Sequence, residues 1–132
     1  MPLYKKILLV DDDKDDIELF QSVINENCPD VQLTVATSGE QVAQLLQKIP
    51  KPDIILLDLN MPIKDGKQCL VEIRGESDFD DIPVAIYSTS SRQADMDFCL
   101  ANGADQYFVK PQTYTGLINF IQGLCTVNSA TV

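Results

Sequence analysis

The sequence predicts one α/β domain in which helices cover both faces of a five-stranded parallel β-sheet, the arrangement called doubly wound. Its 132 residues fit a single domain that is large enough to bury its own core. Apolar runs of strand length alternate five times with segments whose apolar residues recur at helical spacing. Parallel neighbours need right-handed crossovers, so the helices must cover both faces of the sheet. The alternation therefore predicts a (βα)5 chain.

The first two units differ in how deeply their strands are expected to lie. Residues 7–10 are continuously apolar, as in a central strand, and the helix after them carries Ile17, Phe20 and Ile24 on one face. Residues 31–36 alternate apolar and polar side chains, which predicts a half-exposed edge strand. The second helix is marked by Val42, Leu45, Leu46 and Ile49.

The last three units follow the same order of strand and helix. Their strands are predicted at 54–57, 84–87 and 107–109. The apolar residues that mark their helices are Leu70 and Ile73, then Met96, Cys99 and Leu100, and finally Leu117, Phe120, Ile121 and Leu124. Gly103 is expected to end the fourth helix.

Composition excludes several classes of function. The chain has 10 basic and 20 acidic residues and a net charge of -10, so direct nucleic-acid binding is disfavoured and a cationic partner is favoured. The N-terminus has no apolar stretch of the length of a signal peptide or membrane span. We expect a cytoplasmic protein with no membrane contact. Four scattered cysteines without CxxC spacing are expected to be reduced and buried: Cys28, Cys69, Cys99 and Cys125.

Four of the predicted strands end in a polar group. Asp11, Asp12 and Asp13 follow the first strand, and single polar residues, Asp58, Ser88 and Lys110, follow the third, fourth and fifth. Ligands of open α/β sheets bind at the carboxyl ends of the strands. Carboxylates, a hydroxyl and an ammonium at one edge are the groups needed to hold a phosphoryl group with a divalent cation.

The crowding of carboxylates favours a bound metal ion. Three of them cannot share one site fully ionised unless a cation is present or one pKa rises sharply. Oxygen ligands in a chain without histidine indicate Mg²⁺. A simpler alternative is that residues 11–13 only favour the positive N-terminus of the first helix, a capping role that we expect chiefly for Asp13.

The chain resembles a response-regulator receiver domain over nearly its whole length, from Lys5 to about Leu124. The matching motifs are Val-Asp-Asp at 10–12, Leu-Leu-Asp-Leu-Asn-Met-Pro at 56–62, Asp-Gly at 65–66, Ser88, Gly-Ala-Asp at 103–105 and Lys110-Pro111. The resemblance implies the flavodoxin-like strand order 2-1-3-4-5. It also implies one receiver domain over residues 1–132 of the stand-alone type, with a core at about 5–124 and a short tail at 125–132.

The resemblance assigns a role to each polar residue at the sheet edge. Asp58 becomes the phosphoacceptor, while Ser88 and Lys110 bind the oxygens of the transferred group. The residues expected to hold Mg²⁺ are Asp11, Asp12, Asp58 and the backbone carbonyl of Asn60. Ser88 and Tyr107 are expected to form the conformational switch. The protein is then a phosphoacceptor that catalyses only its own phosphorylation and dephosphorylation, and no enzyme in the usual sense.

The resemblance also implies protein partners. The chain has no histidine, so the phosphoryl donor must be another molecule. By resemblance it is the phosphohistidine of a sensor kinase or phosphotransfer protein that docks near Ile17 and Phe20. The Lys110-Pro111 bond is expected to be cis, as is common in receivers. Output is expected through the face of the fourth helix, fifth strand and fifth helix, toward an output protein or a second copy.

Three other functions deserve comparison. A phosphatase of the haloacid dehalogenase type needs a second aspartate where this chain has Asn60, and an FMN-binding flavodoxin would place its phosphate against the acidic residues 11–13. An interaction module that is never phosphorylated is the stronger rival. Titration with Mg²⁺ distinguishes it from a receiver.

Overall fold

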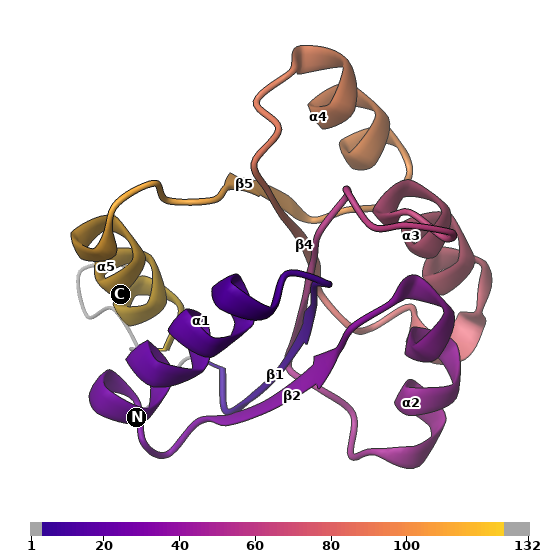
Figure 1. The fold of residues 1–132 in the computed structure, drawn as a ribbon. Helices are drawn as coiled ribbons and strands as arrows, with labels where there is room; N and C mark the ends of the chain where they lie inside the picture. Colours follow the sequence, from indigo (N-terminus) through magenta and orange to yellow (C-terminus); the bar gives the residue numbers. More distant parts are fainter. Residues whose placement is uncertain (1–3, 126–132) are drawn as a thin grey trace, which may run out of the picture.

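The computed structural model describes residues 4–125, in which five parallel strands form one sheet in the order β2-β1-β3-β4-β5 (Figure 1). The strands are β1 (Lys6–Val10), β2 (Gln32–Ala36), β3 (Ile54–Leu57), β4 (Val84–Ser88) and β5 (Gln106–Val109). The expected fold class and strand order are confirmed. The expected tail lies, beyond Cys125, outside the described residues.

Five α-helices cover the two faces of the sheet. They are α1 (Lys14–Asn27), α2 (Val42–Lys48), α3 (Gly66–Gly75), α4 (Gln93–Ala101) and α5 (Tyr114–Cys125), with short 3₁₀ helices η1 (Gly39–Gln41) and η2 (Ser77–Phe79). Helices α1 and α5 lie on one face, and α2, α3 and α4 lie on the other (Figure 1). Each face has its own cluster of buried apolar side chains, so the central strands are buried on both sides.

The register of the strands brings their polar ends together. Val10 pairs with Leu57, so the residues that follow them, Asp11 and Asp58, lie on neighbouring strand ends. The Asp58 N–H donates to the Val10 carbonyl at 2.9 Å. On the other side, the Lys110 N–H donates to the Ser88 carbonyl at 2.8 Å. Backbone hydrogen bonds of the sheet therefore fix the positions of four residues: Asp11, Asp58, Ser88 and Lys110.

Strand β2 is the half-exposed edge strand that the alternating pattern predicted. Helix α4 differs from its sequence pattern. Leu100, expected on the buried face, is 50% exposed, whereas Asp95 is buried beside Cys99. A carboxylate can be buried here because two cations contact it, Lys67 at 2.7 Å and Arg92 at 3.2 Å. Gly103 follows the end of α4 with φ of 103°, a conformation that glycine adopts without strain.

The loop after Asp58 folds back onto the strand that it leaves. The Gly66 N–H donates to the Leu59 carbonyl at 3.0 Å, and the adjacent Asp65 caps α3 by accepting from the Gln68 N–H at 2.9 Å. A Cβ atom on Gly66 would lie 2.1 Å from the Asp58 carbonyl oxygen. Only glycine permits this approach of α3 to the acidic edge.

Replacement of Gly66 by alanine should therefore be destabilising. We expect Gly66→Ala to lower the free energy of unfolding by at least about 2 kcal/mol, because the backbone of Asp58 and Leu59 must move. Gly123→Ala is the matched control, since nothing lies within 4 Å of its Cβ position. It should raise stability by about 0.5–1 kcal/mol. Urea unfolding measures both, and wild-type stability in Gly66→Ala would contradict the packing described.

Candidate functional site

Three carboxylates meet where β1 and β3 end. The side chains of Asp11, Asp12 and Asp58 each offer an oxygen, and these oxygens lie within 4.8 Å of one another. Asp11 and Asp58 are buried, while Asp12 is exposed. Asp13, expected to be a cap, accepts hydrogen bonds from the N–H groups of Asp15 and Asp16 in the first turn of α1. The acidic run is thus divided between a cluster and a helix cap.

A single lysine provides the positive charge next to this cluster. The Lys110 ammonium donates to Asp11 Oδ2 at 2.7 Å and to Asp16 Oδ2 at 2.9 Å, and it lies 3.7 Å from Asp58 Oδ2. Burial opposes its charge, but the two hydrogen bonds and the charge of Asp58 outweigh burial and raise the pKa of Lys110. The ammonium is therefore charged throughout the physiological pH range.

Asp58 has the perturbed ionisation expected of a reactive carboxyl. Its pKa is raised to about 6: burial is the largest cause, Lys110 acts in the opposite direction, and the charges of Asp11 and Asp12 add to the effect of burial. The Asn60 N–H donates a long hydrogen bond of 3.4 Å to Asp58 Oδ1 and favours the ionised form. A cation beside the carboxylates would act in the same direction.

The donor set fits a hard divalent cation. The clustered side-chain ligands are all carboxylate oxygens, which is the ligand chemistry of Mg²⁺, Ca²⁺ and Mn²⁺. Lys110 is the only cationic side chain that residues 4–125 place within 4 Å of Asp11 or Asp58. One ammonium cannot balance three carboxylates, so a second cation would relieve the remaining repulsion.

A chain of polar contacts leads from this edge toward β5. Ser88 is fully buried, and its Oγ accepts from the Ser90 N–H at 3.2 Å. The Tyr107 hydroxyl donates to the Ser90 carbonyl at 2.8 Å, and its ring packs against the core on the α2, α3 and α4 face. The two residues expected to form a switch are therefore joined through one residue of the loop after β4.

Comparison with known proteins identifies the family to which these features belong. Residues 7–122 match the response regulator receiver domain. The chain belongs to this family. Receiver domains are phosphoacceptor switches rather than conventional enzymes, they bind a divalent metal, and they interact with histidine kinases or phosphotransfer proteins.

Two curated relatives illustrate the range of the family. Response regulator Rcp1 of Synechocystis sp. is 34% identical over 126 residues, which cover 91% of this chain and 86% of Rcp1. Transcriptional regulatory protein KdpE of Staphylococcus aureus is 35% identical over 83% of this chain but only 45% of its own length. The receiver described here spans less than half of KdpE.

Solved receiver structures show the same architecture. The phosphorylated cyanobacterial phytochrome response regulator RcpA aligns with a TM-score of 0.83 and 31% identity, covering 91% of this chain and 90% of RcpA. The Mn²⁺-bound form of Rcp1 aligns with a TM-score of 0.82 and 34% identity, covering 94% of this chain and 97% of Rcp1. Both likenesses extend over the sheet and its helices.

One expectation drawn from the resemblance is wrong, and another stays a prediction. Docking of a phosphoryl donor on the first helix near Ile17 and Phe20 is untested, but Phe20 itself cannot make the contact because it is 1% exposed and packs edge-on against Tyr87. Helix α1 presents Leu19 outward instead. The Lys110-Pro111 bond is not cis, since residues 4–125 contain no cis peptide bond. The trans form is the intrinsically favoured one, and Lys110 still reaches Asp11 through its long side chain.

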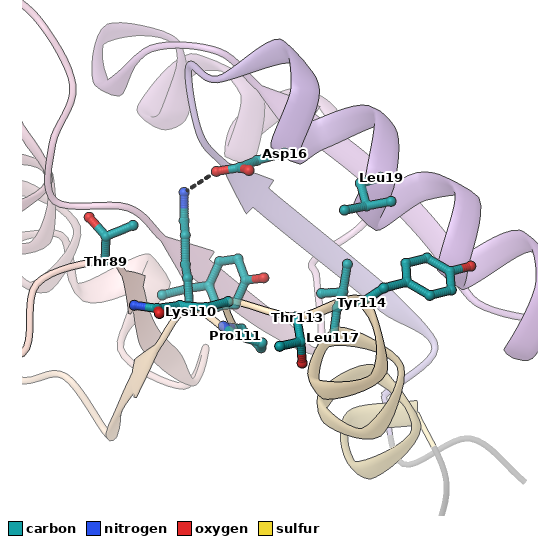
Figure 2. Close-up of a pocket in the computed structure, with 10 residues that line it drawn as sticks. Asp16, Leu19, Thr89, Lys110, Pro111, Thr113, Tyr114 and Leu117 are labelled. Carbon is teal, nitrogen blue, oxygen red and sulfur yellow. Dashed lines mark hydrogen bonds and ion pairs between the residues drawn. The ribbon is translucent and has the colours of Figure 1, made fainter.

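Two acidic residues near this site were missed from the sequence. Asp16 contacts Lys110 across 94 positions of sequence, which no local spacing reveals. Figure 2 shows the Lys110 side chain extending from the end of β5 toward Asp16 on α1, in a pocket that Thr89 and Pro111 also line. Asp95 accepts hydrogen bonds from Ser90 and Arg92. Its pKa is lowered to about 2, chiefly by its contacts with Lys67 and Ser90. Only the i,i+3 spacing of Arg92 and Asp95 hinted at this group.

The crowded carboxylates should lower the stability of the metal-free receiver. In the presence of a chelator at neutral pH, we expect Asp58→Asn to raise the free energy of unfolding by about 1–2 kcal/mol, because it removes a buried charge beside Asp11. Asp30→Asn removes an exposed aspartate and should change stability by less than about 0.5 kcal/mol.

The same comparison has a defined pH dependence. The pKa of Asp58 in the folded protein, about 6, exceeds its ordinary value of 3.8. As the pH falls, the folded protein therefore takes up a proton on Asp58 before the unfolded chain does. The stability difference between Asp58→Asn and wild type should be complete above about pH 6 and should shrink toward about pH 4. A difference that is absent at pH 7, or unchanged down to pH 4, would contradict this electrostatic description.

Proposed function

We propose that this receiver accepts a phosphoryl group on Asp58 from the phosphohistidine of a sensor kinase or phosphotransfer protein, in a reaction that depends on Mg²⁺. One observation carries the proposal: the buried Asp58 carboxylate belongs to an acidic cluster and lies 3.7 Å from the Lys110 ammonium. The relatives RcpA, described as phosphorylated, and Rcp1, described as Mn²⁺-bound, support it.

The proposed chemistry is a substitution at phosphorus. An Asp58 Oδ atom attacks the phosphorus atom, a new O–P bond forms, and the P–N bond to the donor imidazole breaks. The bonding pair remains on the imidazole nitrogen, which takes up a proton. Lys110 stabilises the negative oxygens of the transferred group, and the Ser88 hydroxyl is placed at the same edge to donate a hydrogen bond to one of them.

The metal belongs to the same proposal. Asp11, Asp12 and Asp58, with the backbone carbonyl of Asn60, would hold Mg²⁺. The bound cation would neutralise charge on the carboxylates and on the transferred oxygens. The all-oxygen donor set supports Mg²⁺, and the Mn²⁺ of Rcp1 is a chemically similar ion.

The proposed role of the modified protein is that of a conformational switch. Ser88 is linked through Ser90 to Tyr107, which connects the acceptor edge to the α4, β5 and α5 face. Leu100 on α4 and Val109 on β5 are large exposed apolar side chains on these elements, suited to an output protein or a second copy. The proposal includes a cytoplasmic location, supported by four buried cysteines without a disulfide. None of the helices formed by residues 4–125 is long and apolar enough to span a membrane.

Labelling by acetyl phosphate tests the acceptor directly. Wild type should be labelled only with Mg²⁺, and Asp58→Asn should abolish labelling because it removes the nucleophile. Asp12→Ala should weaken Mg²⁺ binding at least about tenfold, since the cluster loses one carboxylate. Asp97→Asn, an exposed carboxylate on α4, is the control and should behave as wild type. Labelling that survives Asp58→Asn or chelation would exclude this site.

Amide hydrogen exchange tests the output surface. Addition of beryllofluoride, a phosphoryl mimic, should change exchange in residues 88–120 and leave the edge strand at 31–36 unaffected, because residues 88–120 include Ser88, Lys110 and the contacts from Ser88 to Tyr107. Asp58→Asn treated in the same way should show no change. A response confined to the loop after Asp58 would rule out the α4, β5 and α5 face.

A further inference from the structure

The partners of Lys110 are arranged in an unexpected order of distance. Its ammonium lies nearer to Asp11 and Asp16, at 2.7 and 2.9 Å, than to the acceptor Asp58, at 3.7 Å. An ammonium has three N–H donors, and two of them are taken by carboxylates other than the acceptor. The positive charge expected to serve the phosphoryl group is thus shared with an aspartate outside the acidic cluster.

The two competing carboxylates differ in how firmly they are held. The Asp11 side chain is fully buried, and its second oxygen accepts from the Asp13 N–H at 3.0 Å. The Asp16 side chain is 44% exposed and belongs to the first turn of α1. Water and the positive end of that helix can stabilise Asp16 after it loses Lys110, whereas Asp11 has no access to water. Asp16 is therefore the partner that Lys110 can release.

The arrival of a phosphoryl group changes the balance between these partners. The Asp58 carboxylate carries one negative charge, whereas the acyl phosphate formed on it carries roughly two, on oxygens beside Lys110. Asp16 reduces the positive charge available there, and its own charge repels the incoming group. The pocket in Figure 2 is open beside Asp16, so its carboxylate has room to turn toward solvent.

We propose that Asp16 is a positioning residue that holds Lys110 partly away from the phosphoryl site in the unmodified receiver, and that Lys110 exchanges Asp16 for the phosphoryl oxygens when Asp58 is modified. The inference rests on the proposed function. It assigns Asp16 a specific effect: the contact disfavours the modified state and thereby sets how readily the switch turns on.

Beryllofluoride binding at saturating Mg²⁺ tests the exchange. Asp16→Asn should bind about three- to tenfold more tightly than wild type, because Lys110 loses a charged competitor. Asp15→Asn is the matched control, since it removes the same charge from the same helical turn and Asp15 makes no ion pair within residues 4–125. It should change the affinity less than about twofold. Asp16→Glu, which keeps a carboxylate near Lys110, should bind as wild type does.

A second titration separates the contact from general electrostatics. Mg²⁺ affinity without beryllofluoride should fall slightly and equally in Asp16→Asn and Asp15→Asn, since both lose one negative charge near the cluster. Thermal unfolding checks that each variant is folded, and Asp16→Ala repeats the test if Asp16→Asn is unstable.

The outcomes distinguish the inference from the function on which it rests. Equal affinities for beryllofluoride in Asp16→Asn and Asp15→Asn would overturn the inference, as would weaker binding in Asp16→Asn or equally tight binding in Asp16→Glu and Asp16→Asn. Phosphoacceptor function would be untouched by those results. A wild-type protein that fails to bind beryllofluoride, or an Asp58→Asn variant that binds it equally well, would overturn both.

Discussion

The structure depends on one electrostatic constraint, the placement of several carboxylates around a single buried ammonium. Lys110 contacts the fully buried Asp11 carboxylate, and loss of either partner of a buried ion pair strongly destabilises the folded protein. The same ammonium is close enough to Asp58 to lower its pKa against the effect of burial. Lys110 thus connects the end of β5 to the end of β1 and favours the ionised form of Asp58.

The parallel sheet makes this concentration of charge possible. Its register places Asp11 and Asp58 side by side. Two separate clusters of buried apolar side chains stabilise the fold and offset the repulsion between these carboxylates. Gly66 allows the following loop and α3 to return against the Asp58 backbone. The edge is also coupled outward, because Ser88, Ser90 and Tyr107 form a continuous set of contacts toward the α4, β5 and α5 face. In the proposed function, charge added at Asp58 acts on the sheet edge from which these contacts extend to β5.

The local sequence pattern predicted the strands and helices. It could not predict which side chains meet, because those contacts join residues far apart in the sequence. The alternation at 31–36 identified the edge strand, and the family motifs supplied the strand order. Helical spacing placed Phe20 on the apolar face of the first helix, and this face packs against Tyr87 of the sheet, whereas the expectation of docking near Phe20 came only from the resemblance. Asp16 was missed because its partner, Lys110, lies 94 positions later in the sequence. Leu100 was misplaced because Asp95, with its cationic neighbours, occupies the buried side of α4.

A crystal structure of the protein grown with Mg²⁺ and beryllofluoride would show directly which groups hold the phosphoryl mimic. We expect beryllium bonded to an Asp58 carboxylate oxygen, the cation in contact with Asp11 and Asp12 oxygens, and the Lys110 ammonium in contact with a fluorine atom. Beryllofluoride bound elsewhere, or bound at Asp58 with Lys110 directed away from it, would contradict the proposed site.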